Sequence, residues 1–246
     1  MASSRRRRRR AMLRWTVRIL IAAAVAIAGY VVFELVTWPD VAALAKSNPE
    51  STAFLDRWNA RERAAGRAGD AKLRFVPYAR ISNELKHAVV VAEDIDFFSH
   101  EGFATKEMRA AIEKAWEEKE LPRGASTLTQ QLAKNLWLSP SRNPWRKVKE
   151  AILTRQLEKR LDKRRILELY LNVVELGPGV WGCENAARRY FGRSAAALDP
   201  DQAAELAAGL PRPSTWHPGV GSRGYRRHVE RIRERMRRTG WVRGEL

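Results

Sequence analysis

The segment from Ile19 to Phe33 most constrains how this chain can fold, because fifteen consecutive residues carry no charge. Trp15 and Trp38 bracket it, as interfacial aromatic residues bracket a membrane span. From one tryptophan to the other the stretch holds 24 residues. At about 1.5 Å per residue, a helix of that length is long enough to cross the hydrocarbon layer of a bilayer. The sequence therefore predicts one transmembrane helix over residues 19–38.

Two other interpretations of this segment compete with an uncleaved anchor. A buried core helix is one, but six consecutive arginines (Arg5 to Arg10) precede the run and no amphipathic stripe interrupts it. A cleaved signal peptide is the other, because Ala26-Ile27-Ala28 is a small-x-small triplet. The length of the span and Trp38 at its far end favour the anchor.

The basic charge of the chain is unevenly distributed. The net charge is +18, and the first 36 residues hold eight arginines and one glutamate. The positive-inside rule then places the N-terminus in the cytoplasm and everything after Asp40 outside a cytoplasmic (inner) membrane. A basic excess implies an anionic partner: nucleic acid, an anionic lipid surface or a phosphate-bearing substrate. The orientation argues against nucleic acid.

Composition and breaks divide the chain into five parts. They are a basic cytoplasmic tail (1–18), the anchor (19–38), a juxtamembrane segment (39–75), a folded domain (76–218) and a basic C-terminal tail (219–246). Cys183 is the single cysteine, which excludes an intramolecular disulfide and a multi-cysteine metal site. We expect it to be a buried thiol.

Helix signals dominate the folded domain. Ser82 is a cap for a helix with apolar residues at helical spacing, a second helix begins at Ser126, Asn143-Pro144 begins a third, and Asp162 caps a fourth. The expected apolar side of the third helix is Trp145, Val148, Ile152 and Leu157. We expect Gly177-Pro178-Gly179 to stop the fourth helix and two more to cover 184–190 and 201–210. No alternating run predicts a strand, so the fold class is mainly α.

The first segment with chemical potential runs from Glu93 and Asp94 to His100 and Gly102. Glu93 lies one helical turn after Val89, at the edge of the apolar face. A carboxyl group there is partly desolvated, which raises its pKa and makes it a better base near neutral pH. The alternative is an acid at a helix end and a hydrogen-bonded loop histidine.

The second segment runs from Gly124 to Asn135. A glycine turn that feeds a helix leaves free N–H groups at a positive dipole end, which can bind an anion. Lys134 lies one turn after Gln130 and could add a cation. The alternative is an ordinary capped helix start, since no GKS/T ending marks a P-loop.

The third and fourth segments have simple structural readings on their own. Arg146 and Glu150 are four residues apart on one helix face, so a solvated salt bridge accounts for them. The leucine-rich segment from Lys163 to Asn172 is interpreted as mostly structural.

In order and spacing, however, the four segments resemble the signature boxes of the family 51 glycosyltransferases, the peptidoglycan glycosyltransferase family. Those boxes read E-D-x-x-F-x-x-H-x-G, G-x-S-T-x-T-Q-Q-x-x-K-N, R-K-x-x-E and K-x-x-I-L-x-x-Y-L-N. Residues 187–192 and 205–211 look like the family's C-terminal boxes, and the resemblance covers 76–218, with Ala125 where glycine is usual. None of the S-x-x-K, S-x-N and K-T-G transpeptidase motifs follows this region, so a monofunctional member is expected.

The resemblance implies a fold, a reaction and partners. The fold is a lysozyme-like domain with a larger lobe and a smaller membrane-facing jaw. The reaction joins C1 of a growing, undecaprenyl-pyrophosphate-linked strand to the 4-hydroxyl of incoming lipid II, forming a β-1,4 link and releasing the lipid pyrophosphate. Expected partners are lipid II, the glycan strand, membrane lipids and cell-wall synthesis or division proteins.

The resemblance also assigns roles to residues. Glu93 is the expected general base, and Glu150 is expected on the donor side, assisting pyrophosphate departure directly or by holding a divalent cation (Mg²⁺ or Mn²⁺). No other metal site is expected. The residues expected to bind the diphosphate and the sugars are Asp94, Ser126, Thr127, Gln130, Gln131, Lys134, Asn135, Arg142, Arg146 and Lys147.

Two other functions are compatible with parts of this pattern. A lytic transglycosylase or lysozyme could share the fold and a catalytic glutamate, but cleavage of glycan needs no diphosphate site. A non-catalytic basic scaffold on membrane or nucleic acid would leave Glu93 and Glu150 without a role. The polymerase is the function that uses every segment.

Overall fold

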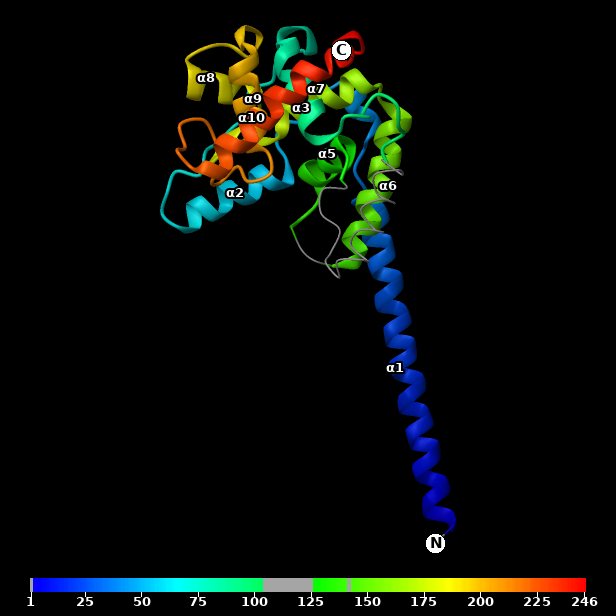
Figure 1. Cartoon of the computed structure of the whole chain (residues 1–246). Helices are drawn as coiled ribbons and strands as arrows, with labels where there is room; N and C mark the ends of the chain where they lie inside the picture. Colours follow the sequence, from blue (N-terminus) through cyan, green and yellow to red (C-terminus); the bar gives the residue numbers. More distant parts are fainter. Residues whose placement is uncertain (1, 104–125, 141–142) are drawn as a thin grey trace. The chain divides into compact units, whose positions relative to one another are not determined.

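The computed structural model describes residues 2–103, 126–140 and 143–246. They form two units, Met1–Asp40 and Val41–Leu246. The first unit is one continuous helix, α1 (Ala2–Val36), drawn in blue in Figure 1. Its part from Arg14 to Val36 is long and apolar enough to span a membrane, and none of its apolar stretch is buried inside the protein. The interpretation as a buried core helix is therefore wrong.

The second unit is mainly helical, as predicted. Among the described residues its α-helices are α2 (Ala53–Ala64), α3 (Asn83–Glu93), α5 (Leu128–Trp137), α6 (Pro144–Arg160), α7 (Lys163–Val173), α8 (Cys183–Phe191), α9 (Pro200–Gly209) and α10 (Arg223–Arg238). Short 3-10 helices lie at Ala42–Ala45, Tyr78–Arg80, Ala195–Ala197 and Gly240–Gly244. The predicted starts and ends of six of these α-helices can therefore be compared with the structure.

Side-chain caps begin most of these helices. Ser82, Asn143 and Asp162 each accept a hydrogen bond from a backbone N–H in the first turn of α3, α6 and α7, so these three predicted caps are confirmed. The helix α5 begins at Leu128 after the cap Thr127, two residues later than the predicted start at Ser126. The reason is a capping box, because the residue three positions after Thr127 is a glutamine that bonds back to the cap.

Two groups of helices form the core. The helix α3 packs against α9 and α10, whereas α5 packs against α6 and α7. Leu85 and Val89 of α3, Leu132 of α5, Leu157 of α6 and Leu169 of α7 are fully buried at these contacts. Burial of each such side chain stabilises the fold by about 1.5–3 kcal/mol. Each of α3, α5, α6 and α7 carries one of the four sequence segments with chemical potential.

The predicted apolar side of α6 is largely wrong. Trp145, Val148 and Ile152 are 40%, 46% and 40% exposed, and of the predicted stripe only Leu157 is buried. The buried face of α6 passes instead through Glu150, two helical turns before Leu157. The packing of α6 on α5 therefore takes a carboxylate into the protein and leaves an apolar stripe outside.

A short hairpin follows α7, where the sequence predicted only a helix stop. Strands β1 (Glu175–Gly177) and β2 (Val180–Trp181) pair antiparallel. Pro178 and Gly179, the latter with φ of 70°, make the turn between them. Strands of three and two residues are too short for alternation to show in the sequence, which explains the missed prediction.

The segment predicted as a basic C-terminal tail contains α10. One face of this helix buries Tyr225, Val229, Ile232 and Met236 against α9 and α3. Its arginines lie largely on the other side, with Arg233 forming ion pairs to Asp201 and Glu205 of α9. These apolar residues are thus the packing face of a helix that belongs to the second unit.

Asn172 ties the extended chain before α3 to α7. It is fully buried. Its Oδ1 accepts the N–H of Val76 at 2.8 Å, and its Nδ2 donates to the carbonyl oxygens of Val76 at 2.9 Å and Glu168 at 2.8 Å. Next to it, a β-carbon on Gly182 would lie 2.4 Å from the Asn172 carbonyl oxygen. The asparagine therefore satisfies backbone groups that burial would otherwise leave unpaired.

Replacing Asn172 by leucine should destabilise the protein strongly. The change keeps the branched shape and the number of heavy atoms of the side chain but leaves the N–H of Val76 without its partner, so we expect a loss of about 2–4 kcal/mol in the free energy of unfolding. Asn185→Leu is the matched control, since Asn185 bonds the chain at Lys72 from a more exposed position and should cost less than about 1 kcal/mol. Denaturant unfolding in detergent measures both, and equal losses would contradict this account.

Candidate active site

Glu93, the predicted base, is the last residue of α3 and faces α5. The Nε2 group of Gln131 donates a hydrogen bond to its Oε2 at 2.8 Å. Burial raises the pKa of Glu93, while the hydrogen bond from Gln131 and the charge of Lys134 lower it and the charge of Asp94 raises it further. The net direction is upwards, as expected for a carboxyl group at the edge of an apolar helix face.

Lys134 links the two predicted catalytic carboxylates. Burial lowers its pKa, and the charges of Glu150 and Glu93 act in the opposite direction. Arg146 and Lys147 add to the lowering. Because both carboxylates act on one ammonium group, residues of α3, α5 and α6 influence one another electrostatically.

Glu150 is a buried carboxylate held by two cations. It is 3% exposed. Its Oε2 lies 2.9 Å from Nη1 of Arg146, and its Oε1 contacts the ammonium group of Lys147. The salt bridge suggested by the spacing exists, but its carboxylate is not solvated. A buried carboxylate needs such partners, because an unpaired charge in the interior is costly.

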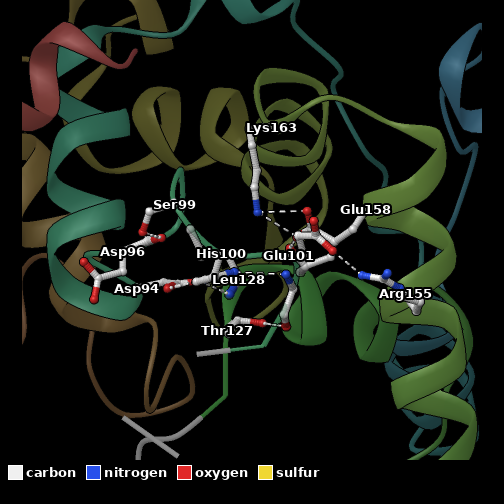
Figure 2. A network of polar contacts seen from close by, with 12 residues as sticks. Asp94, Asp96, Ser99, His100, Glu101, Thr127, Leu128, Arg155, Glu158 and Lys163 are labelled. Atoms are coloured by element: carbon white, nitrogen blue, oxygen red, sulfur yellow. Dashed lines mark hydrogen bonds and ion pairs between the residues drawn. The ribbon is translucent and has the colours of Figure 1, made fainter. Parts of the chain in front are cut away.

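Asp94 joins the end of α3 to the start of α5, as Figure 2 shows. Its two carboxylate oxygens lie 2.9 and 3.1 Å from Nε2 of His100, and Oδ2 accepts the N–H of Leu128 at 2.9 Å. The N–H of Gly102 donates to Nδ1 of His100 at 3.0 Å. Since Nδ1 accepts a hydrogen bond, Nε2 carries the ring proton and donates a hydrogen bond to Asp94.

The start of α5 is accordingly a capped helix end rather than an open anion site. Asp94 is the anion at this N-terminus, because it takes the N–H of Leu128. The hydroxyl of Thr127 accepts the N–H of Gln130, and Oε1 of Gln130 accepts the N–H of Thr127. The capping alternative describes these residues, and substrate contacts by Asp94, Thr127 and Gln130 stay a prediction.

A second, part-buried ion pair supports this region from α6 and α7. The side chain of Glu158 lies 2.8 Å from the ammonium group of Lys163 and accepts the hydroxyl of Thr129. Gly102, with φ of 86°, passes so close that a β-carbon there would lie 2.8 Å from Thr154. The fourth segment, interpreted as structural, thus contributes Lys163 to the framework seen in Figure 2.

The remaining predicted binding residues lie in different settings. Ser126 is exposed immediately before α5, and Asn135 is buried within it. Arg142 lies outside the described residues, as do Gly124 and Ala125 of the second segment. Their contacts with substrate stay predictions.

Sequence reasoning missed Tyr170 as a neighbour of the site. This side chain of α7 is fully buried, and its hydroxyl donates to Oε1 of Gln131 at 2.9 Å. The signal in the sequence is a tyrosine within a run of buried aliphatic residues, because a buried phenol needs a hydrogen-bond partner. That signal predicts a partner but does not name it.

The donor set does not fit a divalent cation. Both oxygens of Glu150 contact cationic side chains, so a metal ion there would have to displace Arg146 or Lys147. Among the described residues, no three His, Cys, Asp or Glu side chains gather as ligands. Cys183 is buried, and burial raises the pKa of its thiol to about 12, so it remains a neutral core residue.

The buried position of Glu93 should cost stability when the side chain is ionised. The pKa of Glu93 is raised in the folded state. The free energy of unfolding therefore falls as the pH rises from the ordinary carboxyl pKa through the raised pKa of the folded protein. Glu93→Gln removes this penalty. We therefore expect the variant to melt at a higher temperature than the wild type at pH 8 and at the same temperature at pH 4.

The control for this measurement is Glu101→Gln. Glu101 is exposed, and its hydrogen bond to Arg155 lowers its pKa, so its removal should bring no gain at pH 8. A Glu93→Gln protein that melts with the wild type at both pH values would show that the carboxyl group carries no burial penalty.

Comparison with known proteins shows the family of this chain. A transglycosylase family model matches residues 61–237. The chain is 41% identical to the biosynthetic peptidoglycan transglycosylase of Laribacter hongkongensis, over 92% of this chain and 97% of that protein. It is 44% identical to the protein of that name from Thiobacillus denitrificans (88% and 92% covered) and 45% to that from Azoarcus sp. (91% and 95%). The chain belongs to the transglycosylase family.

Proposed function

We propose that this protein is a monofunctional peptidoglycan glycosyltransferase, which polymerises lipid II into β-1,4-linked glycan strands and releases undecaprenyl pyrophosphate. Membership of the transglycosylase family and the relatives' names support glycan polymerisation. The observation that supports the proposal most is that the charges of Glu93 and Glu150 both act on the ammonium group of Lys134 and raise its pKa against the effect of burial. A base that can deprotonate a hydroxyl group therefore lies close to cations that can bind a diphosphate.

On the acceptor side, Glu93 takes the proton from the 4-hydroxyl of lipid II as that oxygen attacks C1 of the growing strand. Burial raises the pKa of Glu93 towards neutral pH, which strengthens it as a base. The N–H of Gln131 and the charge of Lys134 counteract protonation, so the base remains available. The hydrogen bond also orients the carboxylate.

On the donor side, cationic side chains bind the diphosphate leaving group. Arg146 and Lys147 contact Glu150, and Lys134 lies within reach of its charge. Three cations around one carboxylate leave a positive excess, which suits a diphosphate that gains charge as the C1–oxygen bond breaks. Glu150 holds Arg146 and Lys147 in position by direct contact. The mechanism therefore needs no step through a metal ion at this carboxylate.

The two alternative functions use less of this geometry. A muralytic enzyme needs a carboxyl group as an acid, but the cluster of Lys134, Arg146 and Lys147 would have no anionic group to bind. A basic scaffold without catalysis would gain nothing from a partly buried Glu93, whose charge costs folding free energy. The cationic cluster beside a base thus favours polymerisation.

The reaction of the purified full-length protein with lipid II tests this proposal. We expect lipid II to be consumed and finished glycan to stay intact. Glu93→Gln should lower turnover by about 10²–10⁴, and Glu150→Gln by at least about tenfold, equivalent to roughly 1.4 kcal/mol of transition-state stabilisation. Glu234→Gln is the control, because this exposed carboxylate of α10 pairs with its helix neighbours Arg237 and Arg238.

Two results would contradict the proposal. Shortening of finished glycan without consumption of lipid II would identify a muralytic enzyme. Normal turnover in Glu93→Gln would remove Glu93 from the reaction, and normal turnover in Glu150→Gln would leave Glu150 as a structural anion.

We further propose that α1 anchors the protein in the cytoplasmic membrane with its N-terminus inside and the second unit outside. The arginines before the span support this orientation. The exposed stripe of Trp145, Val148 and Ile152 on α6 supports contact between this part of the domain and lipid. Lipid II is itself a membrane lipid, so an enzyme that faces the bilayer meets its substrate there.

Protease treatment of spheroplasts tests the orientation. Protease added outside should degrade the second unit, while a tag at residue 1 stays protected by the membrane. A digested tag together with an intact domain would show that the orientation is the opposite of the one proposed. A mature protein that begins near Gly29 would show that the segment is a cleaved signal.

A further inference from the structure

We propose that Tyr170 is a positioning residue for Glu93, which acts through Gln131 by fixing the orientation of the Gln131 side-chain amide. The inference rests on the proposed function, in which Glu93 is the base. It adds a residue of α7 to a site otherwise formed by α3, α5 and α6.

The contact chain is short and spans three helices. The hydroxyl of Tyr170 donates to Oε1 of Gln131 at 2.9 Å, and Nε2 of the same amide donates to Oε2 of Glu93 at 2.8 Å. Tyr170 is fully buried. Its aromatic ring is therefore fixed by packing, and its hydroxyl can point at Gln131 without a competing water.

The amide at the centre of this chain has two different ends. One end accepts hydrogen bonds and the other donates them, and a half-turn about the last side-chain bond exchanges the two. An N–H pointing at Glu93 stabilises the ionised carboxylate, whereas a carbonyl pointing at it stabilises the protonated acid. Whatever fixes the amide therefore fixes which form of the base is favoured.

The hydroxyl of Tyr170 selects the first orientation. Burial raises the pKa of Tyr170 well above its ordinary value, and the charges of Glu93 and Asp94 raise it further. The phenol consequently keeps its proton at any pH at which the enzyme works and must find an acceptor. Oε1 of Gln131 is that acceptor, so the N–H end of the amide is turned towards Glu93. Tyr170 thus favours the ionised form of the base, against the effect of burial, without giving or taking a proton.

The other charged groups near Glu93 take no part in the hydrogen bonds that join Tyr170, Gln131 and Glu93. Lys134 on α5 lowers the pKa of Glu93 and Asp94 at the end of α3 raises it. Lys134 is in turn faced by Glu150, Arg146 and Lys147 of α6. All of these groups remain in a Tyr170→Phe protein, so a change in its pH dependence reports on the amide.

The test compares the pH–rate profiles of wild type, Tyr170→Phe and Tyr225→Phe with lipid II as substrate, using the full-length protein in detergent. Without the hydroxyl, the Gln131 amide can turn its carbonyl to Glu93, which raises the pKa of the base. The acidic limb of the pH profile of kcat should therefore shift to higher pH by about 0.5–1 unit. Turnover on that limb should fall about 3–10-fold and recover to within about threefold of wild type at alkaline pH. Tyr225→Phe removes a buried hydroxyl bonded to the Glu205 carbonyl at 2.9 Å and should leave the limb in place.

A second variant covers the case in which Tyr170→Phe does not fold. Gln131→Met keeps Tyr170 but removes the donor to Glu93, and it should move the acidic limb in the same direction by about 1–2 units. An unmoved limb in a folded variant, or an equal loss of turnover at every pH, would overturn the inference while leaving an active wild type and the proposed function intact. A wild type that does not consume lipid II would overturn both.

Discussion

The hydrogen bond from the N–H of Leu128 to Asp94 is the contact on which the site depends, because it fixes the end of α3 against the start of α5. Asp94 is adjacent to Glu93, and Gln131 lies in the first turn of α5, so the same junction places the amide beside the carboxylate. His100 and Gly102 brace Asp94 from the other side. The segment 93–102 and the start of α5 therefore meet through one buried carboxylate, although Asp94 and Leu128 are 34 positions apart in the sequence.

Charge burial then divides the site into two chemically different sides. Glu93 has few cationic contacts, and burial raises its pKa, which suits a base. Glu150 is buried too, but Arg146 and Lys147 compensate its charge directly. Lys134 lies within reach of both. Two glutamates of the same chain thus acquire different electrostatic properties from their surroundings, and the domain gives up some stability at Glu93 to keep a partly desolvated carboxyl group.

Much of this arrangement could be predicted from the sequence because its signals are local. Caps at Ser82, Asn143 and Asp162 require only the cap and the turn that follows it. The exposed stripe at Trp145 and the burial of Glu150 could not be predicted, since they depend on which face of α6 meets α5. The link from Tyr170 to Gln131 joins residues 39 positions apart, and no periodicity in either helix encodes it. The substrate contacts of the predicted binding residues remain predictions.

If Glu93 is the base, its ionisation controls the reaction. An infrared pH titration of wild type minus Glu93→Gln isolates the carboxyl band of this one side chain, and its midpoint can be set beside the acidic limb of turnover on lipid II. We expect a midpoint above the ordinary carboxyl pKa of 4.5 that coincides with the acidic limb of turnover. A Glu93 carboxyl group that is already fully ionised where turnover is still rising would contradict it.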